Sequence, residues 1–200
     1  MFYDAIKNDH GLRYDPFKAI VAPRPIGWVT TMNGQGDINL APYSFFNGIS
    51  SRPALVMFSS EGLKDSVSFI GETGEFVCNL ATWDLRTQMN ATSAPLPRGV
   101  NEMERAGLAP APSRLVKPPR VAASPCALEC KLIKIVPIES AGGMAVDCHV
   151  VIGHVIGVHI DDRFIVDGKL DTAAMKPIAR CGYDQYAVVE SVFSMQRPPS

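Results

Sequence analysis

The residues best suited to bind a ligand lie around positions 64 to 66. Lys64 carries an ammonium group, Ser66 carries a hydroxyl, and a helical pattern begins at Val67. Asp65 or Ser66 is a suitable N-cap for that helix. The start of a helix exposes unpaired N–H groups and a partial positive charge, a combination that attracts anions. We therefore expect a phosphate group to bind here; the alternative is an ordinary capped helix.

Polar side chains on the neighbouring predicted strands can extend such a site. The sequence predicts strands over 26–32, 38–50 and 54–59, where β-branched and aromatic residues are bounded by glycine, proline and asparagine. The loop 33–37 predicts a hairpin between the first two strands. A phosphate site beside hydroxyl and amide groups suits a flat heterocycle, although a solvated strand face is the alternative. The polar residues concerned are Thr30, Thr31, Ser44, Asn47, Ser59 and Ser60.

The alternation of side chains along a strand restricts which residues can act together. Thr30 and Thr31 must point to opposite faces, so at most one of them can reach a ligand with its side chain. Ser44 lies three positions before Asn47, and its side chain therefore faces the other way unless a bulge intervenes.

Composition and charge exclude several classes of protein. Of the 200 residues, 46% are apolar and 20% are charged, as in an ordinary globular chain with a proper core. The net charge of −1 argues against a general nucleic-acid surface, and no run of Lys and Arg forms a membrane patch. The sequence shows no signal peptide and no apolar stretch of about 20 residues. Five cysteines without a disulfide pattern indicate reduced thiols, so we expect a cytoplasmic protein.

The remaining chain predicts a mainly β protein. Further strands are expected over 75–81, 126–138, 144–160, 163–166 and 186–193. The runs 126–138 and 144–160 are expected to form a hairpin joined at 140–143. Short helices are expected over 66–72, ended by Gly74, over 83–92, capped by Thr82, over 102–106, capped by Asn101, and as one turn over 172–177. Prolines keep 109–125 extended. Many strands without βαβ alternation favour a barrel, and we expect one domain over 1–200 with a lead-in over 1–14.

The sequence gives little support for a metal or a classical nucleotide motif. Cys126 and Cys130 lie roughly 13 Å apart on a predicted strand, too far for two ligands of one zinc ion. Cys148 and His149 are adjacent and face opposite ways. The acidic run 161–171 lacks the spacing of a calcium loop, and neither a dinucleotide fingerprint nor a Walker motif is present. We therefore expect no metal site.

An ordered set of motifs resembles the flavin reductase-like proteins with the FMN-binding split barrel. The first are Arg24-Pro-Ile-Gly-Trp-Val-Thr-Thr, Asn39-Leu-Ala-Pro-Tyr-Ser-Phe-Phe-Asn and Lys64-Asp-Ser. The others are Thr73-Gly-Glu-Phe-Val-Cys-Asn-Leu, Pro97-Arg-Gly-Val-Asn-Glu-Met-Glu-Arg-Ala-Gly-Leu, Ala127-Leu-Glu-Cys and Val155-Ile-Gly-Val-His-Ile-Asp-Asp. The resemblance covers about 15–198. It implies a split β-barrel with short α-helices and Greek-key-like connections.

The resemblance also implies a function. FMN would be the cofactor, NADH or NADPH the reductant, and electrons or reduced flavin would pass to an acceptor or a partner monooxygenase. Such proteins are typically homodimers with the flavin near the interface. An FMN-binding redox sensor or carrier with little NAD(P)H turnover is the alternative, as is a barrel that has lost the cofactor, which the joint presence of Lys64, Ser66 and Asn47 disfavours.

The positions that the resemblance assigns to the flavin extend the polar set. Asn47 can donate and accept together, as the pyrimidine edge of an isoalloxazine requires. His149 is the candidate catalytic residue, next to the nicotinamide or a flavin carbonyl, although a packed structural histidine is the alternative; His154 departs from a usually acidic position. The expected flavin-binding residues are Trp28, Val29, Thr30, Thr31, Ser44, Phe45, Asn47, Ser59, Ser60, Lys64, Asp65, Ser66 and Asn90.

Overall fold

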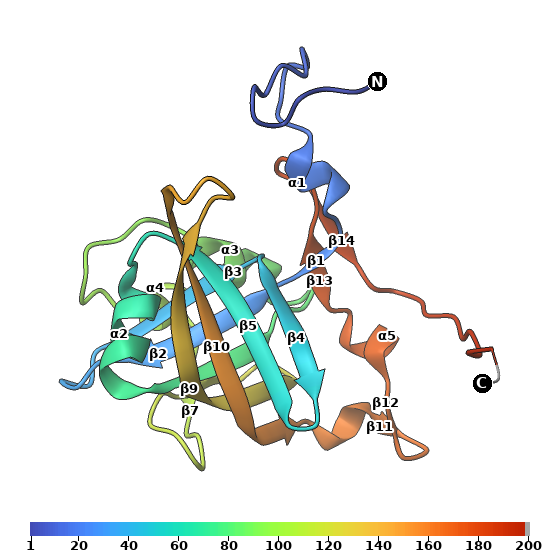
Figure 1. Ribbon diagram of the computed structural model, residues 1–200. Helices are drawn as coiled ribbons and strands as arrows, with labels where there is room; N and C mark the ends of the chain where they lie inside the picture. Colours follow the sequence, from blue (N-terminus) through green and yellow to red (C-terminus); the bar gives the residue numbers. More distant parts are fainter. Residues whose placement is uncertain (199–200) are drawn as a thin grey trace.

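A curled, antiparallel seven-stranded sheet forms the body of the protein (Figure 1). The computed structural model describes residues 1–198. The strand order is β3-β2-β6-β9-β10-β5-β4, and β3 also contacts β5 across the interior. The strands are β2 (Gly27–Met32), β3 (Ile38–Tyr43), β4 (Phe46–Ser51), β5 (Ala54–Glu61), β6 (Glu75–Leu80), β9 (Cys126–Glu139) and β10 (Ala145–Ile160). The β-branched and aromatic runs of the sequence therefore form strands, as predicted.

The predicted strand over 38–50 is two strands. The chain leaves β3 at Tyr43 and enters β4 at Phe46, and these two strands lie at opposite edges of the sheet. Between them, the carbonyl of Phe45 accepts a hydrogen bond of 2.9 Å from the N–H of Ser59 on β5. The short Ser44-Phe45 connection can join the two edges only because the sheet curls into an open barrel.

The helix that begins the predicted phosphate site is α2 (Asp65–Thr73). Its N-cap is Lys64, so the prediction that Asp65 or Ser66 caps the helix is wrong: these two are its first helical residues. Gly74 ends the helix in a left-handed conformation with φ of 71°, as predicted.

The helix expected over 83–92 is shorter than predicted. α3 spans Arg86–Ala91, and Leu85 is its N-cap, because Thr82 instead forms a β-bridge with Pro177. α4 (Glu102–Arg105) begins as predicted, since the Asn101 side chain accepts hydrogen bonds from two N–H groups of the first turn.

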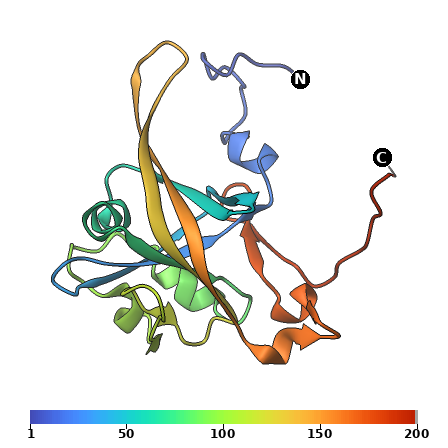
Figure 2. The same ribbon diagram turned by 60° about the horizontal axis from the view of Figure 1, so that its bottom comes forward.

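A small second sheet packs at the side of the barrel. It consists of β1 (Arg24–Pro25), β13 (Ile178–Arg180) and β14 (Tyr186–Val188), so the last strand is shorter than the predicted 186–193. The other elements are α1 (Phe17–Ile20), β7 (Pro110–Ala111), β8 (Arg120–Val121), η1 (Asp162–Phe164), β11 (Ile165–Val166), β12 (Lys169–Leu170) and α5 (Thr172–Met175). Figure 2 shows the β9–β10 hairpin and both terminal segments extending beyond the barrel.

Two hydrophobic clusters pack on opposite sides of β2 and β3. Val29 belongs to the cluster inside the barrel, with Phe58, Phe76 and residues of α2. Trp28 belongs to the cluster formed with α3, α4 and the small sheet. Because both faces of β2 are covered, five of its six residues are buried. No helix within residues 1–198 is both long and apolar enough to span a bilayer.

Candidate functional site

A buried chain of polar side chains lies beneath the N-terminus of α2. The Asn39 amide on β3 donates to Ser66 Oγ at 2.7 Å and to Thr31 Oγ1 at 3.2 Å. Thr31 and Ser66 are at most 1% exposed. The phenol of Tyr43 contacts the hydroxyls of Ser66 and Ser60 by hydrogen bonding, and burial raises its pKa above the usual value despite these partners. β2, β3, β5 and α2 thus each contribute to one connected group of donors and acceptors.

The first turn of α2 offers unpaired hydrogen-bond donors. Within residues 1–198, the N–H groups of Asp65, Ser66 and Val67 have no hydrogen-bond acceptor, and no side chain caps the helix. The exposed Lys64 precedes them directly. Such a turn of a nine-residue helix has the donors and the partial charge that bind an anion.

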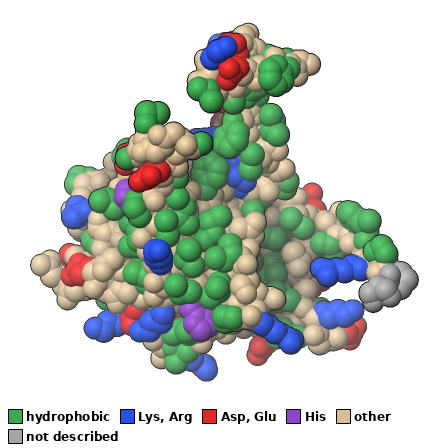
Figure 3. Space-filling view, in the orientation of Figure 1, with side chains coloured by type: hydrophobic (Ala, Val, Ile, Leu, Met, Phe, Trp, Pro, Cys, Tyr) green, Lys and Arg blue, Asp and Glu red, His purple; other side chains and the backbone are tan. Residues whose placement is uncertain are grey.

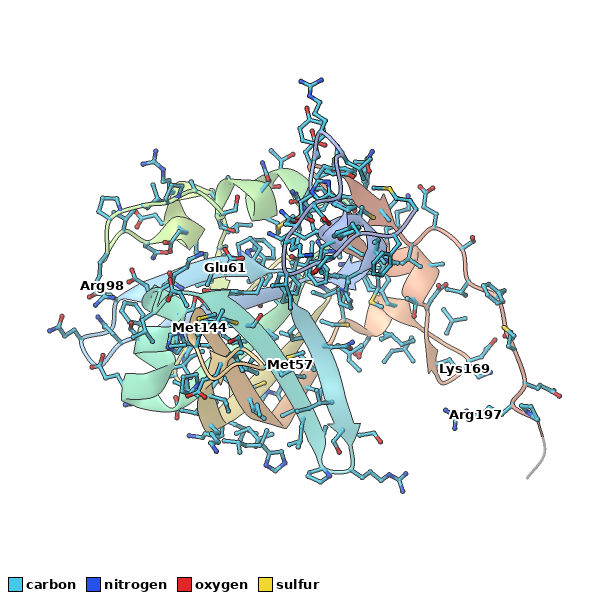
Figure 4. All side chains as sticks on the ribbon, turned by 45° about the horizontal axis from the view of Figure 1, so that its top comes forward. Met57, Glu61, Arg98, Met144, Lys169 and Arg197 are labelled. Atoms are coloured by element: carbon cyan, nitrogen blue, oxygen red, sulfur yellow. The ribbon has the colours of Figure 1, made fainter. Side chains whose placement is uncertain are left out.

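A second cation reaches this turn from a distant loop. Arg98 Nε donates to Asp65 Oδ1 at 2.8 Å, and Arg98 lies beside α2 in Figure 4. Lys64, Asp65 and Arg98 line a cavity of about 350 Å³ with Asn39, Tyr43 and Glu102. The first turn of α2 therefore opens into a space large enough for part of a ligand.

Glu102 supplies a carboxyl group to the same cavity. Its Oε2 accepts a hydrogen bond of 3.0 Å from the N–H of Leu40, and the residue is only 8% exposed. Burial raises the pKa of Glu102, and the nearby Asp65 charge adds to this effect, against the hydrogen bond from Leu40. The environment thus favours the neutral form of Glu102 more than water would.

A larger cavity of about 990 Å³ adjoins the smaller one. Pro42 and Ser93 line both, so the two spaces share a wall. Among the predicted site residues, Ser44 and Asn90 line the larger cavity. Its charged lining residues are Asp15, Lys18, Arg24, Arg180 and Asp184, and its aromatic ones are Tyr14, Phe17, Tyr183 and Tyr186.

Arg24 fixes one wall of the larger cavity. Its guanidinium donates to the carbonyls of Lys18, Val21 and Cys181, at 2.6 Å to the first and 2.9 Å to the last. The guanidinium also lies 5.4 Å from the centre of the Phe45 ring. Arg24 thereby joins α1, the small sheet and the β3–β4 connection.

The structure places the predicted residues of β2 in the core. Trp28 and Val29 are fully buried, and the Trp28 indole N–H donates to Thr92 Oγ1 at 2.9 Å. Thr30 Oγ1 accepts from the Asn79 amide at 2.9 Å, on the opposite side of β2 from Thr31. Of the two threonines, only Thr31 is connected to the first turn of α2, through Asn39.

Other predicted residues are distributed more widely. Ser60 is buried and donates to the carbonyl of Gly62 at 3.0 Å, while Ser59 and Phe45 line a separate recess at the base of the β9–β10 hairpin. Both serines lie within β5 instead of after it. Asn47 is exposed on the edge strand β4 and lines neither of the two cavities.

His149 lies opposite Ser60 in the β10–β5 pairing, next to an irregularity of the β9–β10 ladder. Its Nδ1 is buried and has no hydrogen-bond partner within residues 1–198. The catalytic role of His149 therefore stays a prediction. Among residues 1–198, no three His, Cys, Asp or Glu side chains form a group that could hold a metal ion.

Sequence reasoning did not select Asn39, Tyr43, Arg98 or Glu102 as site residues. All four lie in the motifs that carry the family resemblance. Asn39 and Tyr43 also share the β3 face that the period of two assigns to one side of the sheet. The pairing of Arg98 with Asp65 has no local signal, because 33 residues separate them.

The comparisons with known proteins agree with this architecture. A family model described as "Flavin reductase like domain" matches residues 21–169. An uncharacterized protein of Aquifex aeolicus (strain VF5) is 36% identical over 187 residues, which cover 90% of this chain and 91% of that protein.

Solved structures show the same fold. Nitrilotriacetate monooxygenase component B from Bacillus cereus superposes with a TM-score of 0.89 at 27% identity, covering 98% of both chains. The 2-nitrobenzoate 2-nitroreductase of Pseudomonas fluorescens superposes with a TM-score of 0.86 at 25% identity, covering 100% of this chain and 99% of that one. A Shewanella frigidimarina NCIMB 400 protein with a split barrel domain superposes with a TM-score of 0.84 at 23% identity, covering 100% of this chain and 98% of that one. The curled sheet is therefore a split barrel, as the sequence predicted.

Proposed function

Since this chain belongs to the flavin reductase-like family, we propose that it is an oxidoreductase that binds FMN across the two adjoining cavities. The observation that supports this most directly is the first turn of α2, where three unpaired N–H groups lie between Lys64 and the Arg98–Asp65 pair. FMN carries a phosphate that suits these donors. Its flat ring system then extends past Pro42 and Ser93 into the larger cavity.

The residues at the phosphate end match the chemistry of that group. Backbone N–H groups donate to the phosphate oxygens, and Lys64 and Arg98 contribute charge-assisted hydrogen bonds. Asp65 keeps Arg98 in place, while the raised pKa of Glu102 limits the negative charge that a phosphate meets in this cavity. Ser66 and Tyr43, held by Asn39 and Ser60, supply hydroxyl groups below the turn.

The other predicted flavin-binding residues have different parts in this proposal. Ser44 and Asn90 line the space for the ring, whereas Trp28, Val29 and Thr30 support the site from the core. Thr31 acts through Asn39. Asn47, Phe45, Ser59 and His149 lie outside both cavities, so their assignment to the flavin rests on the sequence alone.

FMN bound in this way supplies the redox chemistry, because it can take two electrons as hydride from NADH or NADPH and pass them to an acceptor. The protein holds the flavin in a fixed orientation and limits access of water to one side of it. The acceptor is a small molecule or a partner monooxygenase; the similar Bacillus cereus protein is named as a component of a monooxygenase.

We also propose that the chain forms a homodimer through the outer face of β5, β9 and β10. The register places Leu55, Met57, Val150, Ile152 and Val136 on this face. Figure 3 shows hydrophobic side chains gathered over these strands, and Met57 is labelled on β5 in Figure 4. A contiguous apolar surface of this kind is typical of an interaction surface. Sedimentation of the chain and of its Met57→Asp variant tests this: a wild-type monomer would refute it.

An anaerobic absorption spectrum tests the oxidoreductase. The purified protein is mixed with FMN, and NADH or NADPH is then added. A flavin spectrum perturbed by the protein that bleaches within seconds supports the proposal and identifies the preferred nucleotide. Bound flavin that stays oxidised favours the redox carrier or sensor. If FMN does not bind to the protein, the proposed FMN site is refuted.

A further inference from the structure

A third cavity continues the larger one away from the first turn of α2. It measures about 360 Å³ and lies between α3 and the small sheet. Met89, Asn90 and Tyr186 line both this cavity and the larger one. The three cavities therefore follow one another along the same side of the barrel, and FMN as placed above occupies only the first and part of the second.

The wall of the third cavity is suited to stacking. Trp83 is 43% exposed, and the guanidinium of Arg86 lies 3.9 Å from the centre of its indole ring. Arg86 Nη1 donates to the carbonyl of Trp83 at 2.7 Å, which fixes this arrangement. Aromatic rings and guanidinium planes are the groups on which nucleic-acid bases stack.

The remaining walls are apolar, with few polar groups. Ile178, Val188 and Met89 face the space, and Thr87 and Asn90 offer hydroxyl and amide groups. No carboxylate within the described residues lines it. A flat, neutral and nitrogen-rich ring fits this combination better than a cation or a sugar.

A cation lies near the junction of the second and third cavities. Arg180 lines the larger cavity, and its guanidinium stacks 4.5 Å from the centre of the Tyr186 ring, which lines both. The carbonyl of Tyr183 accepts a hydrogen bond from Arg180 Nη2. A ligand that passes between the two cavities therefore meets a fixed guanidinium, as a diphosphate bridge requires.

We propose that the third cavity binds the adenine base of the reduced nicotinamide dinucleotide. The nicotinamide lies against the flavin in the larger cavity, the diphosphate passes Arg180, and the adenine stacks at Trp83. The dinucleotide is thus bound in an extended form. This inference rests on the proposed function, because it assumes that NADH or NADPH reduces the bound flavin.

The test compares NADH with reduced nicotinamide mononucleotide, which lacks the adenosine half. In the wild-type protein the KM for the mononucleotide exceeds that for NADH. Trp83→Ala removes the stacking surface and raises the KM for NADH by about 5- to 150-fold, the cost of one lost base stack. The ratio of the two KM values then falls toward one. Trp83→Phe keeps an aromatic face and most of the ratio.

Arg86→Ala is the second variant, because it alters the same stack while Trp83 stays in place. Like Trp83→Ala, it lowers the ratio of the KM for the mononucleotide to the KM for NADH. FMN affinity of each variant shows that the site is folded. An unchanged ratio in both Trp83→Ala and Arg86→Ala, with NADH still oxidised, refutes this inference alone. A wild-type protein that binds FMN but oxidises neither NADH, NADPH nor the mononucleotide refutes the proposed function and this inference with it.

Discussion

Replacement of Lys64 by alanine should weaken the binding of FMN but not that of riboflavin, which lacks the phosphate. An ammonium–phosphate hydrogen bond contributes about 1.5–3 kcal/mol, or about a 10- to 150-fold change in Kd. Lys64 is exposed, so solvent and salt screen its charge, and the lower end of this range applies near 0.15 M salt. The N–H groups of α2 and Arg98 retain part of the affinity.

The assay is a fluorescence titration of each flavin into the purified protein at low and at physiological salt. Lys169→Ala is the matched control, because it removes an exposed lysine from β12 that lines neither cavity. The loss for Lys64→Ala should shrink as salt increases, since the contact is electrostatic. Equal FMN affinity in Lys64→Ala and wild type, or an equal loss for riboflavin, would show that Lys64 does not contact the phosphate.

Three further predictions concern stability. Burial alone would raise the pKa of Glu129, but hydrogen bonds from the N–H groups of Arg114 and Leu115 and from His159 outweigh it and lower that pKa. The stabilisation is therefore present above about pH 4.3 and lost as pH falls through the lowered pKa. Glu129→Gln should lower the free energy of unfolding by about 1–3 kcal/mol at pH 7. It should also flatten the pH dependence of that free energy, measured by urea unfolding; an unchanged loss of stability at acid pH would contradict this. Glu102 has a raised pKa, so its effect on the pH dependence of stability is opposite to that of Glu129. Stability falls as pH rises from about 4.3 through the pKa of Glu102 in the folded state. Glu102→Gln, which keeps an acceptor for Leu40, should be at least as stable as wild type at pH 7, and a marked loss in urea unfolding would refute the desolvation argument. A Cβ at Gly153 would lie 2.2 Å from Cζ of the fully buried Phe76, so Gly153→Ala should lower the unfolding free energy by about 1–3 kcal/mol. At Gly48 the nearest atom is 3.9 Å away, and equal thermal shifts for the two alanine variants would speak against overpacking.

Local signals in the sequence determined many of the elements. Gly74 ends α2 because glycine adopts φ of 71° without strain, and Asn101 begins α4 because its side chain accepts two N–H groups. The long runs that became β9 and β10 pair as the predicted hairpin. The family motifs likewise indicated the split barrel. These features depend on neighbouring residues, and a sequence displays such information directly.

The sidedness of the site shows where sequence reasoning reaches its limit. The period of a strand established that Thr30 and Thr31 point to opposite faces, but it could not say which face the ligand uses. The packing of α2 over β3 places Thr31 on the side of the proposed phosphate site, because Asn39 donates to Ser66 at 2.7 Å and so connects Thr31 to the first turn of the helix.

Closure of the sheet is the other feature that only the tertiary structure decided. The residues 38–50 look like one strand locally, yet β3 and β4 occupy opposite edges, since the curled sheet brings those edges close enough for Ser44 and Phe45 to join them. The same long-range packing places Arg98 against Asp65 and sets three cavities side by side with shared lining residues. The sequence thus determined the elements and the family, while the contacts between distant segments determined which side chains share a site.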